Sequence, residues 1–485
     1  MHKYKSFTEI AKTVGRDVTA TDRPVICVQG LGFVGAAMAL AVANARDQEG
    51  AVLFNVVGVE LPTPEGLLRA ESINTGKFPF KNNDPKITRV MSMVYSEGNL
   101  IATTDPESYF LASVTLVDIN FDITYVDDNP TLVFNGFRSA IRTLGRYMQQ
   151  GSLVIIETTV PPGTCEKVVV PELAAALKER NLPYDSILLA HSYERVMPGN
   201  DYFDSIVNFW RVYAGQTPEA ADACNAFLSK VINVRSYPLT RLNSTTASET
   251  AKVLENSYRA VNIAFIEEWS RFAETVGIDL FDVISVISQR PTHSNIRKPG
   301  FGVGGYCLIK DPLFAPLAAR EFYGLSDLEF PFCTQAVAIN NLMPLVSLEK
   351  VQTILGGELI EKKILLFGVS YRQDIGDTRN SPSQTFVENA LSRGAQVICH
   401  DPLVDYWPEL NIRVSSTLPS PQDIDAIVFA VSHEEYTKFE FHKWLNRATP
   451  VILDANNVLS ESQRNHLSAA GCEVASIGRG GCAHE

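Results

Sequence analysis

The 485-residue sequence has no long apolar run and fewer basic than acidic residues. No stretch reaches the roughly 18 apolar residues that a membrane helix needs, and the segment MHKYKSFTEIAKTVGRDV lacks the apolar centre of a signal peptide. Lysine and arginine number 42 against 55 aspartate and glutamate residues, and the net charge is −13. We therefore expect a cytoplasmic protein that binds neither membranes nor nucleic acid, and whose partner is a small molecule.

Paired cysteines are also missing. The eight cysteines stand at positions 27, 165, 224, 307, 333, 399, 472 and 482, with no CxxC motif and no paired spacing with histidine. This pattern favours reduced thiols over a disulfide framework or a zinc site, and most of these thiols are expected to fill cores. The isolated His293, His400 and His433 do not cluster either, so we expect surface or strand-end roles for them and no metal site.

Strand and helix patterns alternate near both ends of the chain. RPVICV, FNVVGVE, SVTLVDI and SLVIIETTV are typical of parallel strands, and KKILLFGVS, AQVICHDP, IDAIVFAVS and PVILDANN form a second series. Between them, in STTASETAKVLENSYRAVNIAFIEEWSRFAETVG, apolar residues from Ala251 to Phe272 recur every three or four positions, which predicts that this stretch forms one long helix of about eight turns. We predict an α/β protein with two Rossmann-like doubly wound parallel-sheet domains joined by a long central helix that also serves dimerisation. The expected parts are a leader at 1–22, a dinucleotide-binding domain at 23–238, a helical domain at 239–348 and a second α/β domain at 349–485.

A glycine motif follows the first predicted strand. It comprises Gly30, Leu31, Gly32, Phe33, Val34 and Gly35, and the second strand ends at Glu60. A GxGxxG motif between a strand and a helix, followed by an acidic strand end, is typical of dinucleotide binding: the glycines admit a pyrophosphate and the acid accepts the ribose hydroxyls. Because Leu61-Pro62 offers no arginine for a 2′-phosphate, we predict NAD rather than NADP. The alternative is a glycine turn that serves packing only.

One cysteine lies in an unusual setting. In PGFGVGGYCLIKDPLF, Cys307 follows several glycines and precedes Lys310 and Asp311. A cysteine nucleophile needs access and positive neighbours, so we expect the glycines to let a substrate carbon approach the thiol. On the long helix, Lys252 and Asn256 are one turn apart and suit the stabilisation of an oxyanion or a water, although a solvated helix surface is the alternative.

Taken in order, these motifs resemble the UDP-glucose/GDP-mannose dehydrogenase family of nucleotide-sugar 6-dehydrogenases. The resemblance covers nearly the whole chain through GLGFVG, INTGKFPF, ETTVPPGT, ERVMPG, ETAKVLEN, PGFGVGGYCLIKDP, YRQDIGDTRNSP and HDP. It implies an NAD-dependent four-electron oxidation of a sugar C6 alcohol to a carboxylate, with two NAD and one water, in a homodimer whose long helix carries the subunit contact. A role in polysaccharide biosynthesis is implied in the same way.

The resemblance also implies roles for individual residues. Cys307 would form a thiohemiacetal and then a thioester, Lys252 and Asn256 would stabilise the oxyanion, Asp311 with Lys252 would position water, and Glu194 would serve in acid–base work. The implied substrate contacts are Phe301, Gly304, Lys310, Tyr371, Arg372 and, one position out of register, Arg290. The implied cofactor contacts are Gly30, Gly32, Phe33, Val34, Gly35, Glu60, Thr159 and Arg379.

The chain departs from the family pattern at three places. Where the family usually has VPTP after the fourth strand, this chain has Asn120, Phe121 and Asp122, so a threonine hydroxyl is missing or displaced to Thr124. This puts the hydrolysis step in doubt. Tyr193 replaces the proline of SPER, and Arg372 stands where lysine is common, a change that is not neutral where one compact charge is needed.

The sequence leaves the substrate and the reaction type open. The form ER-V-x-PG resembles the branch that acts on UDP-N-acetylhexosamines, whereas GGYCLIKD resembles the UDP-glucose branch. We expect a UDP-hexosamine or a related UDP-sugar. Two alternatives remain, namely a two-electron dehydrogenase of the β-hydroxyacid type and a catalytically impaired homologue that only binds the sugar nucleotide.

Overall fold

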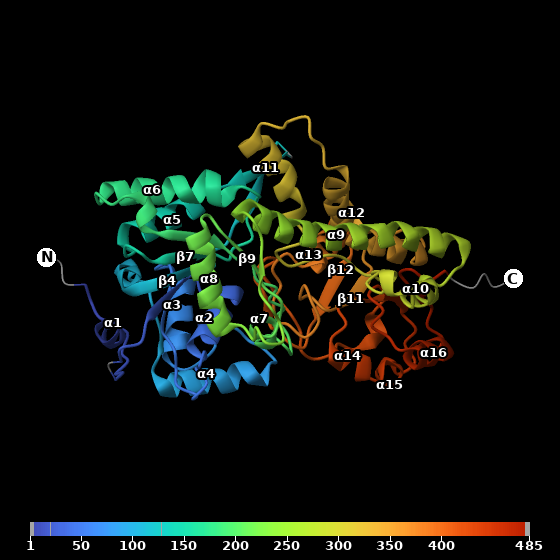
Figure 1. Ribbon diagram of the computed structural model, residues 1–485. Helices are drawn as coiled ribbons and strands as arrows, with labels where there is room; N and C mark the ends of the chain where they lie inside the picture. The colour runs from blue at the N-terminus through green and yellow to red at the C-terminus, as the bar shows by residue number, and fades with distance from the viewer. Residues whose placement is uncertain (1–3, 20, 128, 481–485) are drawn as a thin grey trace. The chain divides into compact units, whose positions relative to one another are not determined.

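The computed structural model describes residues 4–19, 21–127 and 129–480, which form two compact units (Figure 1). The first unit comprises Met1–Leu254 and Leu313–Glu329, and the second comprises Glu255–Pro312 and Phe330–Glu485. Within the described part of the chain, no helix combines the length and the apolar composition that a membrane crossing requires.

The first unit is built on an eight-stranded sheet of order β10-β9-β8-β7-β4-β1-β2-β3. Its strands are β1 (Val25–Gln29), β2 (Asn55–Val59), β3 (Leu100–Thr103), β4 (Ala112–Val117), β7 (Leu153–Ile156), β8 (Leu188–His191), β9 (Val212–Gly215) and β10 (Thr240–Arg241). All neighbours pair parallel except β8 and β9. The predicted parallel sheet is thus confirmed, with one antiparallel pairing that the sequence pattern did not indicate.

Helices flank this sheet because its strands are apolar on both faces. In β1, the consecutive residues Ile26, Cys27 and Val28 are all fully buried, which a strand shows only when both faces are covered. One core unites this sheet with the alanine-rich α2 and with α4 and α8, while α5 and α6 lie together on the opposite side in Figure 1. The helices are α1 (Phe7–Thr13), α2 (Phe33–Ala43), α3 (Pro64–Asn74), α4 (Pro85–Glu97), α5 (Asn135–Tyr147), α6 (Val170–Glu179), α7 (Asp204–Val207) and α8 (Pro218–Val231).

A hairpin interrupts the alternation after β4. Strands β5 (Asp122–Val126) and β6 (Asn129–Val133) pair antiparallel and form a separate two-stranded sheet. It occupies the place where the family motif VPTP is missing.

The predicted long helix is α9 (Thr245–Val276), which has 32 residues and continues from the first unit into the second. Its supposed apolar face is largely exposed, since Tyr258, Phe265, Trp269 and Phe272 have 47–53% of their surface accessible. The neighbouring helices are α10 (Leu280–Ser288), α11 (Phe314–Tyr323) and α12 (Pro331–Ile354).

The second unit contains a five-stranded parallel sheet of order β12-β11-β15-β16-β17. Its strands are β11 (Lys363–Phe367), β12 (Gln396–His400), β15 (Ala426–Phe429), β16 (Val451–Asp454) and β17 (Val474–Ser476), and β13 (Tyr406–Trp407) pairs with β14 (Ile412–Arg413). Helices α13 (Pro382–Ser392), α14 (Glu434–Lys438), α15 (Phe441–Leu445) and α16 (Glu461–Ala469) complete it. The strand order reverses beside β11, and parallel sheets bind ligands at such points. The second predicted α/β domain is confirmed.

Candidate active site

The glycine turn joins β1 to α2 in the geometry that dinucleotide binding requires. Gly30 has φ +88°, and a Cβ there would lie 2.5 Å from the carbonyl oxygen of Asp118. Gly32 caps the N-terminus of α2, and no described atom lies within 4 Å of the position that its Cβ would take. A Cβ on Gly35 would collide with the carbonyl of Gly30. The space beside Gly32 at a helix N-terminus fits a pyrophosphate, while the other two glycines allow the turn and its packing. Phe33 and Val34 form the half-buried first turn of α2.

Glu60 lies directly after β2 and is tied to the glycine turn. Its Oε1 accepts a hydrogen bond from the Leu31 N–H at 2.8 Å and pairs with Arg69 Nη1 at 3.1 Å, and its Oε2 accepts from the Leu61 N–H at 3.1 Å. The sequence did not indicate Arg69 as a partner of Glu60, because Arg69 lies in α3, nine residues further along the chain.

Two acids lie directly after β4 and β7: Asp118 is half-buried and Glu157 is buried. Burial and the neighbouring Glu157 raise the pKa of Asp118 well above its usual range, and burial raises the pKa of Glu157 although Arg211 opposes it through an ion pair. Burial and Lys252 lower the pKa of His191 to about 3, so His191 is neutral and its Nδ1 lies 2.8 Å from Ser248 Oγ. These groups suit the retention of protons rather than the binding of a cation.

The missing threonine of VPTP has no direct substitute on β4. Phe121 is 3% exposed, and its ring packs on Phe134, Phe137 and Phe314 at centroid distances of 4.9, 5.7 and 5.5 Å. Thr124 is exposed on β5, within the hairpin. Thr158, after β7, instead binds this segment, since its Oγ1 accepts from the Ile119 N–H at 3.1 Å and donates to the Ile119 carbonyl at 2.9 Å. The half-buried Thr159 follows it.

Glu194 and Lys252 come together in the first unit. Lys252 Nζ donates to the Glu194 carbonyl at 2.7 Å and lies 3.5 Å from Glu194 Oε1, and both residues are buried. Tyr193, in place of the family's proline, puts its ring 5.5 Å from Lys252 Nζ and accepts from Arg195 Nη2 at 3.0 Å. The sequence analysis did not assign Tyr193 a contact with the lysine. Lys252 is held in place, so the alternative of a solvated helix surface does not apply.

Cys307 opens a tight turn in the second unit that ends in a buried carboxylate. Its carbonyl accepts from the N–H groups of Lys310 and Asp311 at 3.3 and 2.9 Å. Asp311 is fully buried, its Oδ2 accepts from Asn256 Nδ2 at 2.7 Å, and its Oδ1 lies 3.4 Å from Lys310 Nζ. The structure thus brings Asn256, Lys310 and Asp311 together one turn beyond the thiol.

Cys307 is exposed, whereas most other described thiols are buried. Burial raises the pKa of all five buried ones, which are Cys27, Cys165, Cys224, Cys399 (to about 12) and Cys472. A buried thiol with a raised pKa is a poor nucleophile, so the expectation that most cysteines fill cores is confirmed. Cys333 is half-exposed, and Cys482 lies outside the described residues.

The glycines before Cys307 have a different role from the one predicted. A Cβ on Gly304 would lie 2.7 Å from the Asn380 carbonyl and 2.9 Å from the Tyr371 Cβ, and one on Gly305, at φ +79°, would lie 2.9 Å from the Tyr371 ring. A Cβ on Gly302 would be 2.5 Å from Pro382. Protein atoms therefore lie where the sequence predicts room beside these glycines for an approaching substrate carbon. The glycines instead allow the segment 371–382 to pack closely.

That segment carries several predicted contact residues. Burial and Asp377 raise the pKa of Tyr371 to about 12, and Arg372 is exposed. The Arg379 guanidinium donates two hydrogen bonds to Asp377, and its Nη1 lies 3.3 Å from the hydroxyl of Tyr306, the residue directly before Cys307. Two further predicted residues lie elsewhere: Phe301 is 1% exposed and belongs to the core of the second unit, and Arg290 is exposed after α10.

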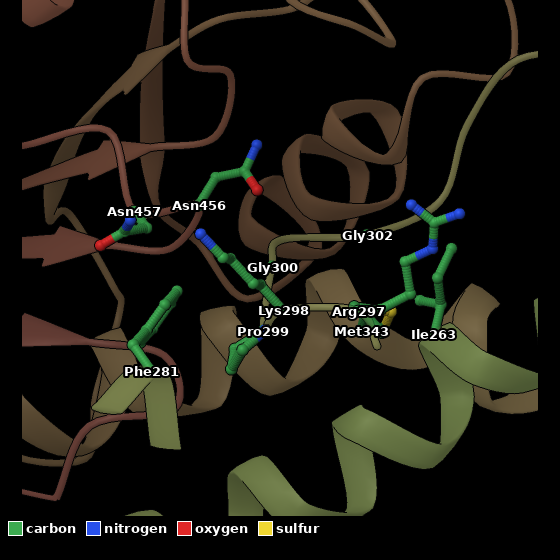
Figure 2. Close-up of a pocket in the computed structure, with 10 residues that line it drawn as sticks. All are labelled: Ile263, Phe281, Arg297, Lys298, Pro299, Gly300, Gly302, Met343, Asn456 and Asn457. Atoms are coloured by element: carbon green, nitrogen blue, oxygen red, sulfur yellow. The ribbon is translucent and has the colours of Figure 1, made fainter. Parts of the chain in front are cut away.

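A pocket of about 290 Å³ in the second unit was missed by the sequence analysis (Figure 2). Arg297 and Lys298 line it together with Asn456 and Asn457, and Lys298 extends toward the loop that holds the two asparagines. Arg297 Nε is buried without a hydrogen-bond partner among the described atoms, and burial and Arg259 lower the pKa of Arg297. Two cations beside amide groups suit an anionic, hydrogen-bonding ligand. No sequence motif marks these two basic residues, which directly precede the glycine-rich segment that contains Cys307.

The glycine turn in the first unit is typical of dinucleotide-dependent dehydrogenases, and the second unit holds an exposed thiol in the turn that leads to a buried carboxylate. Family models support this class: the NAD binding, central and UDP binding domains of the UDP-glucose/GDP-mannose dehydrogenase family match residues 24–232, 246–342 and 365–461. The chain belongs to this family, which confirms the resemblance. It is a nucleotide-sugar dehydrogenase that uses a nicotinamide dinucleotide.

Several relatives match along most of their length. The UDP-N-acetyl-D-mannosamine dehydrogenases of Pyrococcus horikoshii and Methanocaldococcus jannaschii are 30% and 29% identical to this chain; the matches cover 90% of it in both cases, and 96% and 92% of the relatives. The crystal structure of NDP-N-acetyl-D-galactosaminuronic acid dehydrogenase from Methanosarcina mazei superposes with a TM-score of 0.76 at 27% identity, covering 96% of this chain and 97% of its own.

Proposed function

We propose that this protein oxidises the C6 hydroxymethyl group of a UDP-N-acetylhexosamine to a carboxylate in two successive two-electron steps. The bound nicotinamide would accept one hydride in each step. Two features support NAD as the cofactor: the space beside Gly32 and the acid Glu60 at the end of β2. The overall reaction consumes one water and releases two hydrides and three protons.

Cys307 links the two oxidations. After the alcohol has lost a hydride and a proton, the Cys307 Sγ adds to the aldehyde carbon and the thiol proton passes to the new oxygen, giving a thiohemiacetal. Loss of a second hydride and of the hydroxyl proton leaves a thioester. Water then adds to the carbonyl carbon, the C–S bond breaks, and the carboxylate and the thiol are formed with release of a proton. The covalent link prevents escape of the aldehyde.

The neighbouring side chains supply charge and orientation. We assign Lys252 and Asn256 to the developing oxyanion, Asp311 with Lys252 to the water, and Glu194 to proton transfer. Support comes from the 2.7 Å contacts of Lys252 with the Glu194 carbonyl and of Asn256 with Asp311. The substrate contacts proposed from the family pattern are Gly304, Lys310, Tyr371, Arg372, Arg290 and Phe301, and Thr159 and Arg379 are proposed for the cofactor.

The observation that carries this proposal is the exposure of Cys307 among thiols that are mostly buried. The test measures the number of NADH and the amount of uronic acid formed per UDP-sugar. The wild type should form two NADH and one uronic acid, and Cys307→Ala should form no uronic acid. Cys333→Ala is the matched control and should keep two, because Cys333 is also accessible but lies in α12. Undiminished conversion to the uronic acid by Cys307→Ala would refute the covalent step.

The choice of sugar and base rests on the relatives and on the pocket. Relatives along 90% of the chain are named for N-acetylated hexosamines, and the pocket with Arg297 and Lys298 offers cations and amides for a nucleotide. A panel of UDP- and GDP-sugars, scored for NADH and for the uronic acid, should give the highest kcat/KM with a UDP-N-acetylhexosamine. Faster turnover of UDP-glucose would contradict this choice.

We also propose a homodimer formed through α9, with residues 239–348 as the dimerisation domain. The exposed stripe of Tyr258, Phe265, Trp269 and Phe272 repeats at helical spacing, and a self-complementary apolar stripe of this kind is suited to a second copy of the same helix. Sedimentation of the intact protein should give twice the chain mass of 53.4 kDa.

A second candidate function is binding without turnover. Phe121 removes the hydroxyl that the family usually places after β4, and Thr124 does not replace it. Release of two NADH per substrate would exclude this candidate, and one NADH would indicate the β-hydroxyacid type, which the match to the UDP binding domain already disfavours.

A further inference from the structure

Glu60 has little hydrogen-bonding capacity left for a ribose. A carboxylate oxygen accepts about two hydrogen bonds. Oε1 already receives the Leu31 N–H and Arg69 Nη1, and Oε2 receives the Leu61 N–H, so one acceptor position on Oε2 remains. The Glu60 side chain is only 8% exposed. A bidentate grip on both ribose hydroxyls by Glu60 alone is therefore not available.

Arg69 supplies what Glu60 lacks. Only Nη1 of its guanidinium has a hydrogen-bond partner among the described atoms, and 30% of its side chain is exposed. The guanidinium lies over the Phe80 ring at 5.6 Å, and Phe80 stacks on Phe33 of the glycine motif at 4.0 Å. Arg69 is thus held against the glycine turn, and its remaining N–H groups are available as donors. The planar guanidinium matches the geometry of a phosphate well.

We propose that the Glu60–Arg69 pair, rather than Glu60 alone, determines the choice between NAD and NADP. This rests on the proposed use of NAD. In the native pair, the carboxylate neutralises the guanidinium and opposes a 2′-phosphate, while the remaining Oε2 position and the Arg69 N–H groups bind the ribose hydroxyls. Without the carboxylate charge, Arg69 becomes a ligand for the 2′-phosphate.

The test is a binding cycle that needs no turnover. Fluorescence titration gives Kd for NADH and NADPH with the wild type, Glu60→Gln, Arg69→Gln and the double variant. The wild type should bind NADH more tightly. Glu60→Gln should tighten NADPH binding by roughly tenfold or more, because a charge-assisted contact to phosphate replaces a repulsion, and the double variant should lose that gain. Arg69→Lys in the Glu60→Gln background should keep part of it.

The outcomes separate the two proposals. An equal gain in NADPH affinity with and without Arg69, or no gain in Glu60→Gln, would overturn the role of Arg69 while leaving the dehydrogenase proposal intact. A wild type that binds neither dinucleotide would overturn both. Because Glu60→Gln also weakens the acceptor of Leu31 and Leu61, thermal unfolding checks its fold. If Glu60→Gln fails to fold, the Arg69→Gln variant tests the proposal by itself. Arg69→Gln should weaken NADPH binding more than NADH binding, and any other result would overturn the role of Arg69.

Discussion

The hydrogen bond between Asn256 and Asp311 gives a sharp test of the proposed site through Asn256→Asp. The native amide donates to a fully buried carboxylate at 2.7 Å. The substitution keeps the size of the side chain but places a second carboxyl group at that distance. Two ionised carboxylates 2.7 Å apart would repel each other by about 6 kcal/mol at an effective dielectric constant of about 20. The pair will therefore retain one shared proton, and this proton restores a donor toward Asp311.

This retained proton predicts an unusual pH dependence. At low pH, the protonated carboxyl group introduced at position 256 replaces the amide as donor, and kcat should approach that of the wild type. As the pH rises and the proton is lost, the ratio of variant to wild-type kcat should fall by about ten- to a hundredfold, the equivalent of losing a charged buried hydrogen bond of about 1.5–3 kcal/mol.

The assay is NADH formation by both proteins from pH 6 to pH 10, together with thermal unfolding at each pH. Asn256→Ser is the matched control: it removes the amide donor without adding a carboxyl group, so its loss of kcat should be the same at every pH. A ratio for Asn256→Asp that does not change with pH would refute the reasoning that Asp311 acts as a carboxylate held by residue 256.

Three other predictions concern side chains that the structure singles out. Tyr193→Phe should keep kcat within about twofold, because the ring near Lys252 remains, whereas Tyr193→Leu should lower kcat about fivefold through loss of a cation–π contact of about 1 kcal/mol; equal losses in both variants would contradict this. Burial raises the pKa of Glu267 from 4.5 to about 7. The folded protein thus binds this proton more tightly than the unfolded chain, so the free energy of unfolding falls as the pH rises between these values. Glu267→Met removes this loss. It should therefore increase the free energy of unfolding at pH 8 by up to about 3 kcal/mol, seen as a higher unfolding temperature, and should give no such increase at pH 4. Trp269→Asp should convert the proposed dimer to monomers in sedimentation with the helical circular dichroism unchanged; a persistent dimer would place the interface elsewhere.

The elements that local pattern determines could be predicted. β1 is apolar at consecutive positions because both of its faces are covered, and the glycine motif lies between a strand and a helix because the tight turn needs the positive φ of Gly30. The long α9 follows from helical spacing that extends over most of its length. These features depend on neighbours within a few residues, so the sequence carries them directly.

Features that depend on distant contacts could not be predicted. Arg69, in α3, reaches back to Glu60 nine residues earlier, and Tyr193 meets Lys252 across a long separation in sequence. The pocket forms where Lys298 approaches the loop with Asn456 and Asn457. None of these contacts produces a repeating pattern in the sequence. The antiparallel β8–β9 pairing is also set by sheet order rather than by the composition of either strand.

The glycines before Cys307 show why composition alone misassigned a cause. A run of small residues beside a nucleophile predicts room for a substrate, yet here Tyr371 and Pro382 fill that room. The consequence favours the proposed chemistry, because the packing fixes the backbone at Gly304 and Gly305 and leaves the adjacent cysteine exposed. A nucleophile works best when its approach direction is set before the substrate arrives. The glycines therefore let the loop before Cys307 pack closely against the segment 371–382 while Cys307 itself stays exposed.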